Sequence, residues 1–435
     1  MNVAGKSSGP EANILEQHSP APAHSAWSSR RWVILGFLLA ITVINFIDRQ
    51  TVSILAPIIR QIFHLSNEAY GNVVAAFQFG MMSGELPMGW VMDRWGCRLG
   101  LSVAVLWWSA ATGAQAFVRS GTQLGLTRFW MGTSECGNYS GGMKVVSEIF
   151  PVKERTLAIG IFNSGSVIGA VLAPPLIVFL AHRYGFRAAF LFPASLGLLW
   201  AVAWWFTYRT LPAPAAEHKS AEVSLSLLLR QAPAWGTMLC RFFVGPVVQF
   251  YWYWLPSYLY SARHMSMLEI GALSWIPYFL GGMGGVAGGW AAAALHKAGA
   301  SNYKVRTVTM YSSSILCLAS LAVPFVASTI VAFLAISLVI FAHNFLSANM
   351  YGSITDLFPE TAVGRATGLT GVASGLSGLL FPLLTGFLVD RISYKPVFAL
   401  AAMMPLIGTI ILFALARKRR FNEPSHAALT PEGSF

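Results

Sequence analysis

Charged side chains are scarce in this sequence, and long polar stretches are rare. Of its 435 residues, 11% are Asp, Glu, Lys or Arg, whereas 55% are hydrophobic. Soluble domains average about 25% charged residues, so this composition excludes a soluble enzyme. The mean hydropathy of +0.58, together with 15 Trp and 29 Phe, indicates a chain whose surroundings are mostly lipid. Its length allows about a dozen membrane spans of roughly 20 residues each.

Cysteine is also rare, and its distribution excludes two kinds of site. The four cysteines are Cys97, Cys136, Cys240 and Cys317. They lie far apart and mostly in apolar stretches, so they have neither the spacing of metal ligands nor that of a disulfide framework. We expect them to be packing residues, and we expect no metal and no cofactor.

The net charge of +12 has a membrane explanation. The basic residues occur in short clusters between apolar segments, as the positive-inside rule requires, so we expect no nucleic-acid partner. If the N-terminus is cytoplasmic, 19 of the 29 Lys and Arg residues fall on the cytoplasmic side and seven on the other. This asymmetry predicts that both termini are cytoplasmic.

Apolar runs divided by polar residues, Pro and Gly predict twelve transmembrane helices. Their expected ranges are 32–58, 70–91, 99–118, 122–146, 156–181, 188–208, 235–260, 268–294, 304–326, 328–354, 363–389 and 395–416. The fold class is therefore an all-α polytopic membrane protein.

The predicted helices separate into two sets of six. We expect the following parts: a disordered cytoplasmic tail (1–29), an N-terminal six-helix bundle (30–208), a cytoplasmic linker (209–234), a C-terminal six-helix bundle (235–416) and a basic cytoplasmic tail (417–435). The linker is the longest polar stretch between spans, and its SLSLLLR segment can lie along a membrane surface.

The two halves repeat each other at an offset of 208 residues. The segment SEIFP at 147–151 corresponds to TDLFP at 355–359, and the same offset pairs Pro174 with Pro382 and Phe190 with Phe398. An offset of six helices relates two bundles of the same orientation. Parallel repeats of this kind are typical of transporters with a site at the membrane midplane between the halves.

A motif between the second and third predicted helices carries a family resemblance. Residues 89–98 read GWVMDRWGCR and resemble the G-x-x-x-D-R-x-G-x-R signature of the major facilitator superfamily. The resemblance implies two pseudo-symmetric six-helix bundles and a conformational gate, whose charges and helix ends lock one rocking state. The gate residues would be Gly89, Asp93, Arg94, Gly96 and Arg98. A positively charged cytoplasmic turn is the alternative interpretation of the motif.

Within that superfamily the chain resembles the anion:cation symporters over about residues 30–420. Bacterial hexuronate and D-galactonate transporters, sialin and vesicular glutamate transporters share the patterns NFIDR at 45–49, RFWMGTSE at 128–135 and SEIFPVKER at 147–155. The resemblance implies a transporter, not an enzyme, that imports a carboxylate-bearing sugar acid or a similar organic anion with protons. It also implies a bacterial inner membrane and a monomer.

The exact anion stays open, because the chain departs from its relatives. Galactonate transporters have Tyr where this chain has Phe46 and Met81, and hexuronate transporters have an uncharged residue where it has Asp48. Other segments, such as GLTG at 368–371 and FAH at 341–343, are most similar to hexuronate transporters.

Arg49 and Arg128 lie within predicted spans, where an arginine costs about 2.5 to 3.5 kcal/mol or more. Each should therefore face water or a partner. A guanidinium can hold a substrate carboxylate through two hydrogen bonds, and the resemblance favours Arg49 as the direct ligand. The alternative is a permanent structural pair with Asp48 or Glu135.

Asp48 and Glu135 are the predicted proton-coupling residues. A carboxylate without water binds a proton more readily, whereas a nearby arginine opposes protonation, so a conformational change that separates the two can load a proton. The matching acids carry protons in galactonate transporters. A purely structural ion pair is again the alternative.

The remaining substrate-binding candidates are neutral residues. In the N-terminal half they are Asn45, Asn163 and Ser166, and in the C-terminal half they are Gln249, Tyr251, Asn344 and Ser374. Glu85 is interpreted as a gate or packing contact, Arg241 as an interfacial residue and His343 as a weak proton site. Helix packing by small polar residues is the competing explanation for several of them.

Two other functions remain as alternatives. One is an exporter or antiporter of another carboxylate or of an amphipathic compound, although two arginines and two acids in the N-terminal half oppose it. The other is a polytopic membrane enzyme with His343 or His182 as base, for which the sequence shows no nucleophile motif, metal cluster or phosphate loop.

Overall fold

The computed structural model describes residues 30–208, 224–416 and 421, and their regular elements are all helices. The expected terminal tails and most of the expected linker lie outside the described residues. In the N-terminal half the helices are α2 (Arg31–Ile54), α3 (Ala56–Ile62), α4 (Asn67–Gln115), α5 (Gly121–Ile149), α6 (Val152–Tyr184) and α7 (Ala188–Thr207). In the C-terminal half they are α8 (Leu225–Leu229), α9 (Ala232–Arg263), α10 (Met267–Leu273), α11 (Trp275–Lys297), α12 (Asn302–Leu316), the 3-10 helix η1 (Cys317–Leu321), α13 (Thr329–Leu357), α14 (Glu360–Arg391) and α15 (Tyr394–Leu415).

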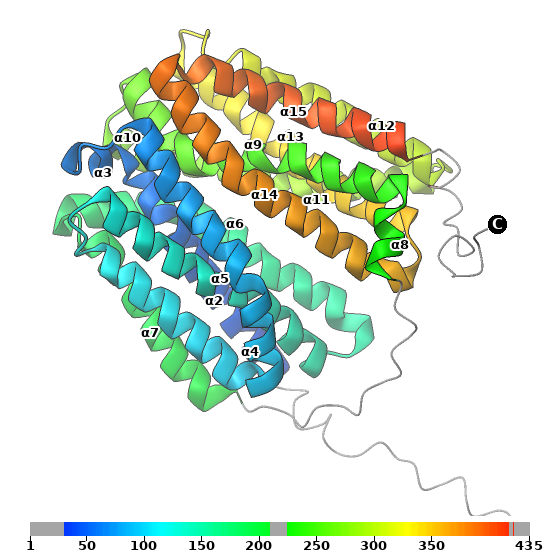
Figure 1. The fold of residues 1–435 in the computed structure, drawn as a ribbon, viewed down its shortest axis with the longest axis horizontal. Helices are drawn as coiled ribbons and strands as arrows, with labels where there is room; N and C mark the ends of the chain where they lie inside the picture. The colour runs from blue at the N-terminus through cyan, green and yellow to red at the C-terminus, as the bar shows by residue number, and fades with distance from the viewer. Residues whose placement is uncertain (1–29, 209–223, 417–420, 422–435) are drawn as a thin grey trace, which may run out of the picture.

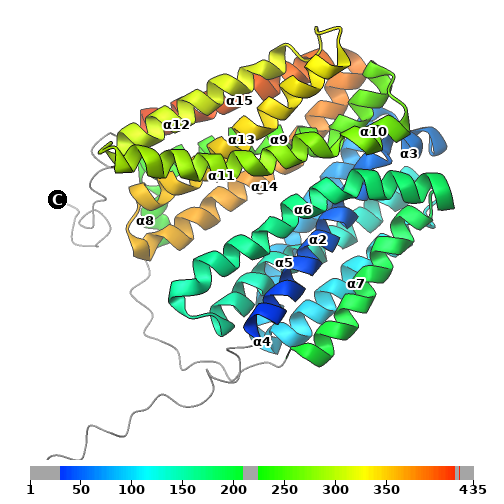
Figure 2. The same cartoon turned by 180° about the vertical axis from the view of Figure 1, so that it is seen from behind.

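The helices form two bundles, one for each half of the sequence, that lie side by side (Figures 1 and 2). The described chain crosses from end to end six times in each half, because α4 contains two of the predicted spans and α10 with α11, and α12 with η1, each supply one. The predicted fold class is therefore confirmed. Seven of these described segments are long and apolar enough to span a membrane, namely those ending at Ile54, Tyr184, Thr207, Lys297, Leu357, Arg391 and Leu415.

The turn between the second and third spans is tighter than the sequence suggests. The expected loop of 92–98 is helical except at Gly96, whose φ of 74° and ψ of 163° kink α4. Residues with a side chain rarely adopt a positive φ of this kind, whereas glycine does so at no steric cost. Gly96 therefore lets one helix turn directly into the next and sets the angle of the motif at 89–98.

The ninth span ends earlier than predicted. The sequence indicates a helix over 304–326, but α12 ends at Leu316 and continues only as the 3-10 helix η1 to Leu321. Residues 322–328 form turns and a short irregular segment before Ser328 caps α13 by accepting a hydrogen bond from the Val331 backbone. Hydrophobicity alone cannot separate an α-helix from such an ending, because both bury the same apolar residues.

The two bundles meet at one end of the molecule, which we name the closed end: the end formed by α3, α10 and the last turn of α14 (Figure 1). Here Asp390 accepts hydrogen bonds from the Asn67 amide (2.7 Å) and from the backbone N–H groups of Asn67 (3.1 Å) and Glu68 (2.7 Å). The carboxylate of one half thus caps the first turn of α4 in the other, where the helix dipole favours negative charge. Towards the end that holds α8, the ribbons of the two bundles diverge.

The crossing of α4 and α5 is a close one that depends on glycines. A Cβ on Gly132 would meet the Phe77 backbone carbonyl and the Met81 amide nitrogen, and a Cβ on Gly80 would meet the backbone of Phe129. Small residues at such crossings let two helix backbones approach, which maximises van der Waals contact where lipid supplies no hydrophobic drive for association. This crossing fixes the position of α5, which carries Arg128 and Glu135.

Replacing Gly132 by Ala should therefore lower the thermal unfolding midpoint of the purified protein, because the obstacle is backbone rather than a movable side chain. Gly125→Ala is the matched control in the same helix, since a Cβ there meets nothing within 4 Å. Alanine gains about 1 kcal/mol of helix propensity over glycine, so the control should be neutral or stabilising. Equal midpoints for the two variants would contradict the proposed role of the crossing.

Candidate functional site

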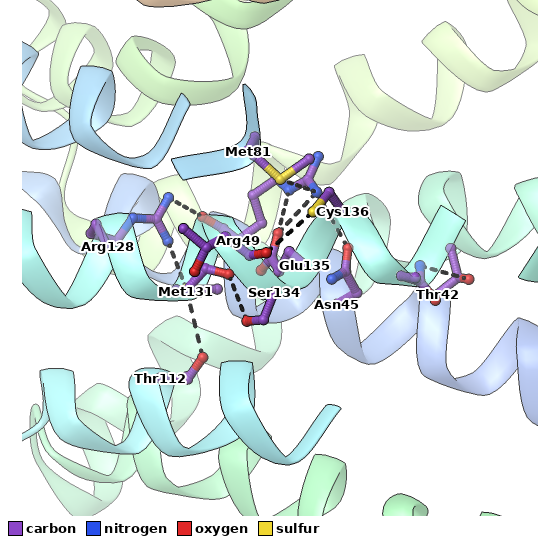
Figure 3. A network of polar contacts seen from close by, with 12 residues as sticks. Thr42, Asn45, Arg49, Met81, Thr112, Arg128, Met131, Ser134, Glu135 and Cys136 are labelled. Atoms are coloured by element: carbon purple, nitrogen blue, oxygen red, sulfur yellow. Dashed lines mark hydrogen bonds and ion pairs between the residues drawn. The ribbon is translucent and has the colours of Figure 1, made fainter. Parts of the chain in front are cut away.

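The centre of the N-terminal half holds a buried ion pair between Arg49 on α2 and Glu135 on α5 (Figure 3). The Arg49 Nη2 and Nε atoms donate to the same Glu135 oxygen, Oε2, at 2.9 and 3.0 Å. The Arg49 side chain is 15% exposed and that of Glu135 is 0% exposed. The pair thus has one member that faces open space and one that is sealed inside the bundle.

Neighbouring side chains fix the orientation of the Arg49 guanidinium. The Asn45 side-chain oxygen accepts from Nη2 at 3.4 Å, and the Met81 sulfur lies 3.9 Å from the same nitrogen. The rings of Phe46 and Phe77 lie 4.8 and 5.3 Å from the guanidinium carbon, at distances where cation–π attraction operates. Asn45, a predicted substrate-binding residue, therefore contacts the Arg49 guanidinium directly.

Arg128 is buried deeper in the same bundle and has weaker partners. Its Nη2 donates to the Arg49 backbone carbonyl at 3.3 Å, its Nη1 to the Met131 sulfur at 3.3 Å, and its guanidinium lies 4.2 Å from the Phe77 ring centre. The ion pairs of the described chain do not include Arg128. Because a thioether is a weak acceptor, these contacts compensate the buried positive charge of Arg128 only weakly.

Asp48 lies next to Arg49 in sequence but faces a different direction. Its side chain is 1% exposed, and neither carboxylate oxygen has a hydrogen-bond partner among the described residues. An ionised carboxylate in such a position is costly unless it is paired or hydrated. The site thus combines one carboxylate paired with an arginine and one that lacks a hydrogen-bond partner among the described residues.

A cavity of about 310 Å³ lies between the two halves and exposes the Arg49 side of the pair. We name it the central cavity. Residues of α2, α4, α9, α13 and α14 line it: Arg49, Gln78, Met81, Met82, Glu85, Arg241, Gln249, Trp252, Tyr253, Tyr351, Gly371, Ser374 and Gly375. Its volume lies at the lower end of the range of small-molecule sites.

The central cavity has a second guanidinium that the sequence interpretation placed at the membrane interface. Arg241 on α9 lines it, with its guanidinium 5.3 Å from the Tyr351 ring centre and its Nε buried without a partner among the described residues. The charge within an apolar run was the signal that could have identified it. Its position early in the span suggested an interface, whereas its side chain lines the central cavity.

The structure brings some of the predicted binding residues together and separates others. Arg49, Gln249 and Ser374 line the central cavity, and Ser166 and Asn344 line an adjoining cavity. Tyr251 lies inside the C-terminal bundle, where its hydroxyl is 2.9 Å from that of Ser320, and Asn163 is exposed but lines neither cavity. His343 is buried and its Nε2 lies 3.3 Å from the Ser347 hydroxyl.

The hydrogen bonds and ion pairs of the predicted gate with described residues stay within its own half. The Asp93 carboxylate pairs with Lys144 at 2.7 Å, and Arg98 donates to the Trp205 carbonyl at 2.7 and 3.0 Å while stacking over its ring at 4.4 Å. The Asp93 and Arg94 side chains are exposed, and a Cβ on Gly89 would meet nothing within 4 Å. This is the end at which the two bundles diverge (Figure 1).

The 208-residue repeat reveals a difference between the halves near this gate. Arg306 and Asp356 correspond to Arg98 and Glu148, and they form an ion pair of 2.7 Å that also includes the Asn349 side chain at 3.1 Å. In the N-terminal half Glu148 instead accepts from the Tyr208 hydroxyl at 2.6 Å.

The Arg49–Glu135 pair generates a stability prediction. Glu135→Leu leaves a permanently charged guanidinium partly buried and should lower stability by about 3 kcal/mol, the lower end for one partner of a buried pair because Arg49 keeps contact with the cavity. Adding Arg49→Met should restore much of the loss. The pair Arg31–Glu154, with exposures of 22% and 36%, is the control: Glu154→Leu should cost about 1 kcal/mol or less. Thermal unfolding in detergent compares these three variants with the unaltered protein. A double variant no more stable than Glu135→Leu contradicts the expected coupling.

Comparisons with known proteins agree with the fold. The chain is 27% identical over 408 residues to the hexuronate transporter of Escherichia coli K12, covering 89% of this chain and 94% of that one. It is 29% identical over 408 residues to the hexuronate transporter of Bacillus subtilis 168, covering 90% and 96%. A solved structure of a bacterial homolog of the human lysosomal transporter Spinster, in an inward-facing and occupied conformation, superposes with a TM-score of 0.76 at 18% identity, covering 91% of this chain and 99% of that chain, and shows the likeness of fold alone.

The family model described as Major Facilitator Superfamily matches residues 38–344 and 300–433. These two matches together cover nearly all of the helices described above. The resemblance that the motif at 89–98 carries is thereby confirmed, as is a multi-pass membrane protein. The chain belongs to the major facilitator superfamily.

Proposed function

We propose that the chain is a proton-coupled symporter that imports a hexuronate, an aldonate or a related sugar acid by rocker-switch alternating access. The single observation that carries the proposal is the Arg49–Glu135 pair, whose arginine faces the central cavity while its carboxylate is sealed inside the bundle. The similarity to hexuronate transporters of two bacteria supports the substrate class.

The pair supplies a physical link between anion and proton. In this proposal an entering carboxylate competes with Glu135 for the Arg49 guanidinium, whose Nε and Nη2 atoms now donate to Glu135. Glu135 then loses the partner that compensates its burial, and an ionised carboxylate without a partner is costly there. A proton on Glu135 removes that cost, so anion binding and protonation favour each other. Asp48, which is already unpartnered, is the second proton site in this proposal.

The orientation follows from the distribution of basic residues. The motif at 89–98 and α8 lie at the end where the bundles diverge, and the predicted loops on this side carry most of the Lys and Arg residues, so we place this end in the cytoplasm together with both termini. In the inner membrane of a bacterium, the closed end then faces away from the cytoplasm. In this conformation the central cavity releases or accepts substrate on the cytoplasmic side. The chain would work as a monomer, with lipid as its other partner.

An amphipathic-compound exporter is less consistent with the cavity. Arg49, Arg241 and Glu85 line it together with two glutamines, and charged walls are costly for an apolar cargo to desolvate. A membrane enzyme would change its substrate chemically. Uptake of labelled D-glucuronate into proteoliposomes, with the label recovered as unchanged D-glucuronate, tests the proposed function against both. No uptake of any hexuronate, aldonate or dicarboxylate in such a screen would reject it.

Arg49→Lys should reduce hexuronate binding and uptake at least about tenfold, because a lysine keeps the charge but loses the planar, two-pronged geometry. The variant should fold and insert normally. Arg60→Lys is the control, since the Arg60 side chain lies on α3 and donates to the Leu65 carbonyl, away from the central cavity. Binding is measured by the substrate-induced shift of the unfolding midpoint. Unchanged uptake in Arg49→Lys would place the anion site elsewhere.

Glu135→Gln mimics the protonated acid, so it should retain or improve anion binding yet abolish accumulation driven by a pH gradient. Counterflow, the exchange of labelled for unlabelled substrate without net proton movement, should persist. Asp48→Asn is expected to weaken accumulation in the same way. If each variant and the double variant still concentrate substrate against its gradient, neither acid couples transport to protons. Uptake driven by sodium at constant pH would also reject proton coupling.

A further inference from the structure

A second cavity of about 230 Å³ adjoins the central cavity, and we name it the side lobe. It lies between α2, α6, α9, α11 and α13, on the side where α6 and α11 run next to each other (Figure 2). Trp252 borders both cavities. The Phe46 ring meets Trp252 edge-on at 5.9 Å and lies 4.8 Å from the Arg49 guanidinium. The side lobe therefore begins one aromatic ring away from the proposed anion ligand.

Three glycines of α11 line the side lobe, and one of them, Gly285, leaves space in it. A Cβ on Gly285 would meet nothing within 4 Å, so the missing side chain leaves room. Gly281 and Gly282 are different, because a Cβ on the former would crowd Ile340 and one on the latter would crowd Val167. Those two glycines bring the helices together, while Gly285 keeps the lobe open.

The side lobe offers little to a polar ligand. The residues that line it carry no charged side chain, and three of its polar groups already have partners. The Ser166 hydroxyl donates to the Asn163 carbonyl at 2.7 Å, the Tyr278 hydroxyl to the Tyr251 carbonyl at 3.2 Å, and the Asn344 amide to its own helix at 3.2 Å.

The central cavity has the opposite character. Arg241 Nε and Gln249 Oε1 are buried and lack hydrogen-bond partners among the described residues, and Glu85 and Gln78 line the same space. Such groups need a ligand or water to satisfy them. Sugar hydroxyls suit the central cavity, whereas only an apolar group gains from entering the side lobe.

We propose that the preferred substrate is a hexuronic acid that carries an apolar substituent, an aryl or alkyl hexuronide, which binds more tightly than the free sugar acid. The carboxylate binds Arg49, the sugar hydroxyls occupy the central cavity, and the substituent packs against Phe46, Trp252 and the open face at Gly285. This inference rests on the proposed function, because it takes Arg49 as the carboxylate ligand.

A ligand series with the unaltered protein tests the inference in proteoliposomes. 4-Nitrophenyl β-D-glucuronide should inhibit uptake of labelled D-glucuronate at about tenfold lower concentration than unlabelled D-glucuronate does, because the aryl ring is buried. 4-Nitrophenyl β-D-glucopyranoside, which lacks the carboxylate, should not inhibit. Equal inhibition by the glucuronide and free glucuronate overturns the inference, as does equal inhibition by the two nitrophenyl sugars.

Gly285→Leu fills the side lobe and should bring the preference for the nitrophenyl glucuronide over glucuronate close to one. Gly289→Leu is the matched control on the same helix, since it also has open space around its Cβ but does not line the lobe. A preference that survives Gly285→Leu, or that falls equally in both variants, overturns the inference. Saturable D-glucuronate uptake without any preference for the glucuronide contradicts this inference but not the proposed function. The absence of a response to either ligand contradicts both.

Discussion

The rest of the structure depends on the burial of one carboxylate, Glu135, against Arg49, an arginine that also lines the central cavity. A buried ion pair contributes little net stability, because desolvation offsets much of the attraction, but removing one partner is expensive. Arg49 joins the sealed interior of the N-terminal bundle to the central cavity. The fold around it serves this requirement: glycines hold α5 against α4, and Phe46, Phe77 and Asn45 keep the guanidinium at the cavity wall.

Much of the fold could be predicted because a membrane imposes simple rules on sequence. Apolar runs of span length, the repeat at 208 residues and the motif at 89–98 together indicate two six-helix bundles, and the structure has them. The sequence could not indicate that α12 stops at Leu316, since buried apolar residues favour neither an α-helix nor a 3-10 ending. Nor could it reveal the α4–α5 crossing, because glycines at 80 and 132 read equally well as flexible points and as contact points.

The candidate site was predictable in its charges but not in its pairing. Arg49, Asp48, Arg128 and Glu135 are conspicuous in an apolar sequence, because charges in lipid are rare. Which acid holds Arg49 depends on side-chain direction: successive helix residues differ by about 100°, so adjacent Asp48 and Arg49 cannot face the same partner. The adjoining cavities escaped prediction because their walls come from helices far apart in sequence.

The two halves contribute different groups to the cavities, and this difference gives the proposed alternating access an energetic basis. In the proposed mechanism the N-terminal half supplies the carboxylate ligand and the two acids, and the C-terminal half supplies Arg241, Gln249 and the glycine face of α11. A ligand in both cavities contacts both halves at once, so its binding energy depends on the angle between them. Opening the closed end must break the contacts of Asp390 with α4. Their loss can be offset by contacts that the same motion creates at the divergent end, where Asp93 and Arg94 are exposed. In the proposed mechanism a substrate that contacts both halves binds the two states with different affinity and so shifts their populations, whereas one that contacts only Arg49 is held by a single half and does not favour the change.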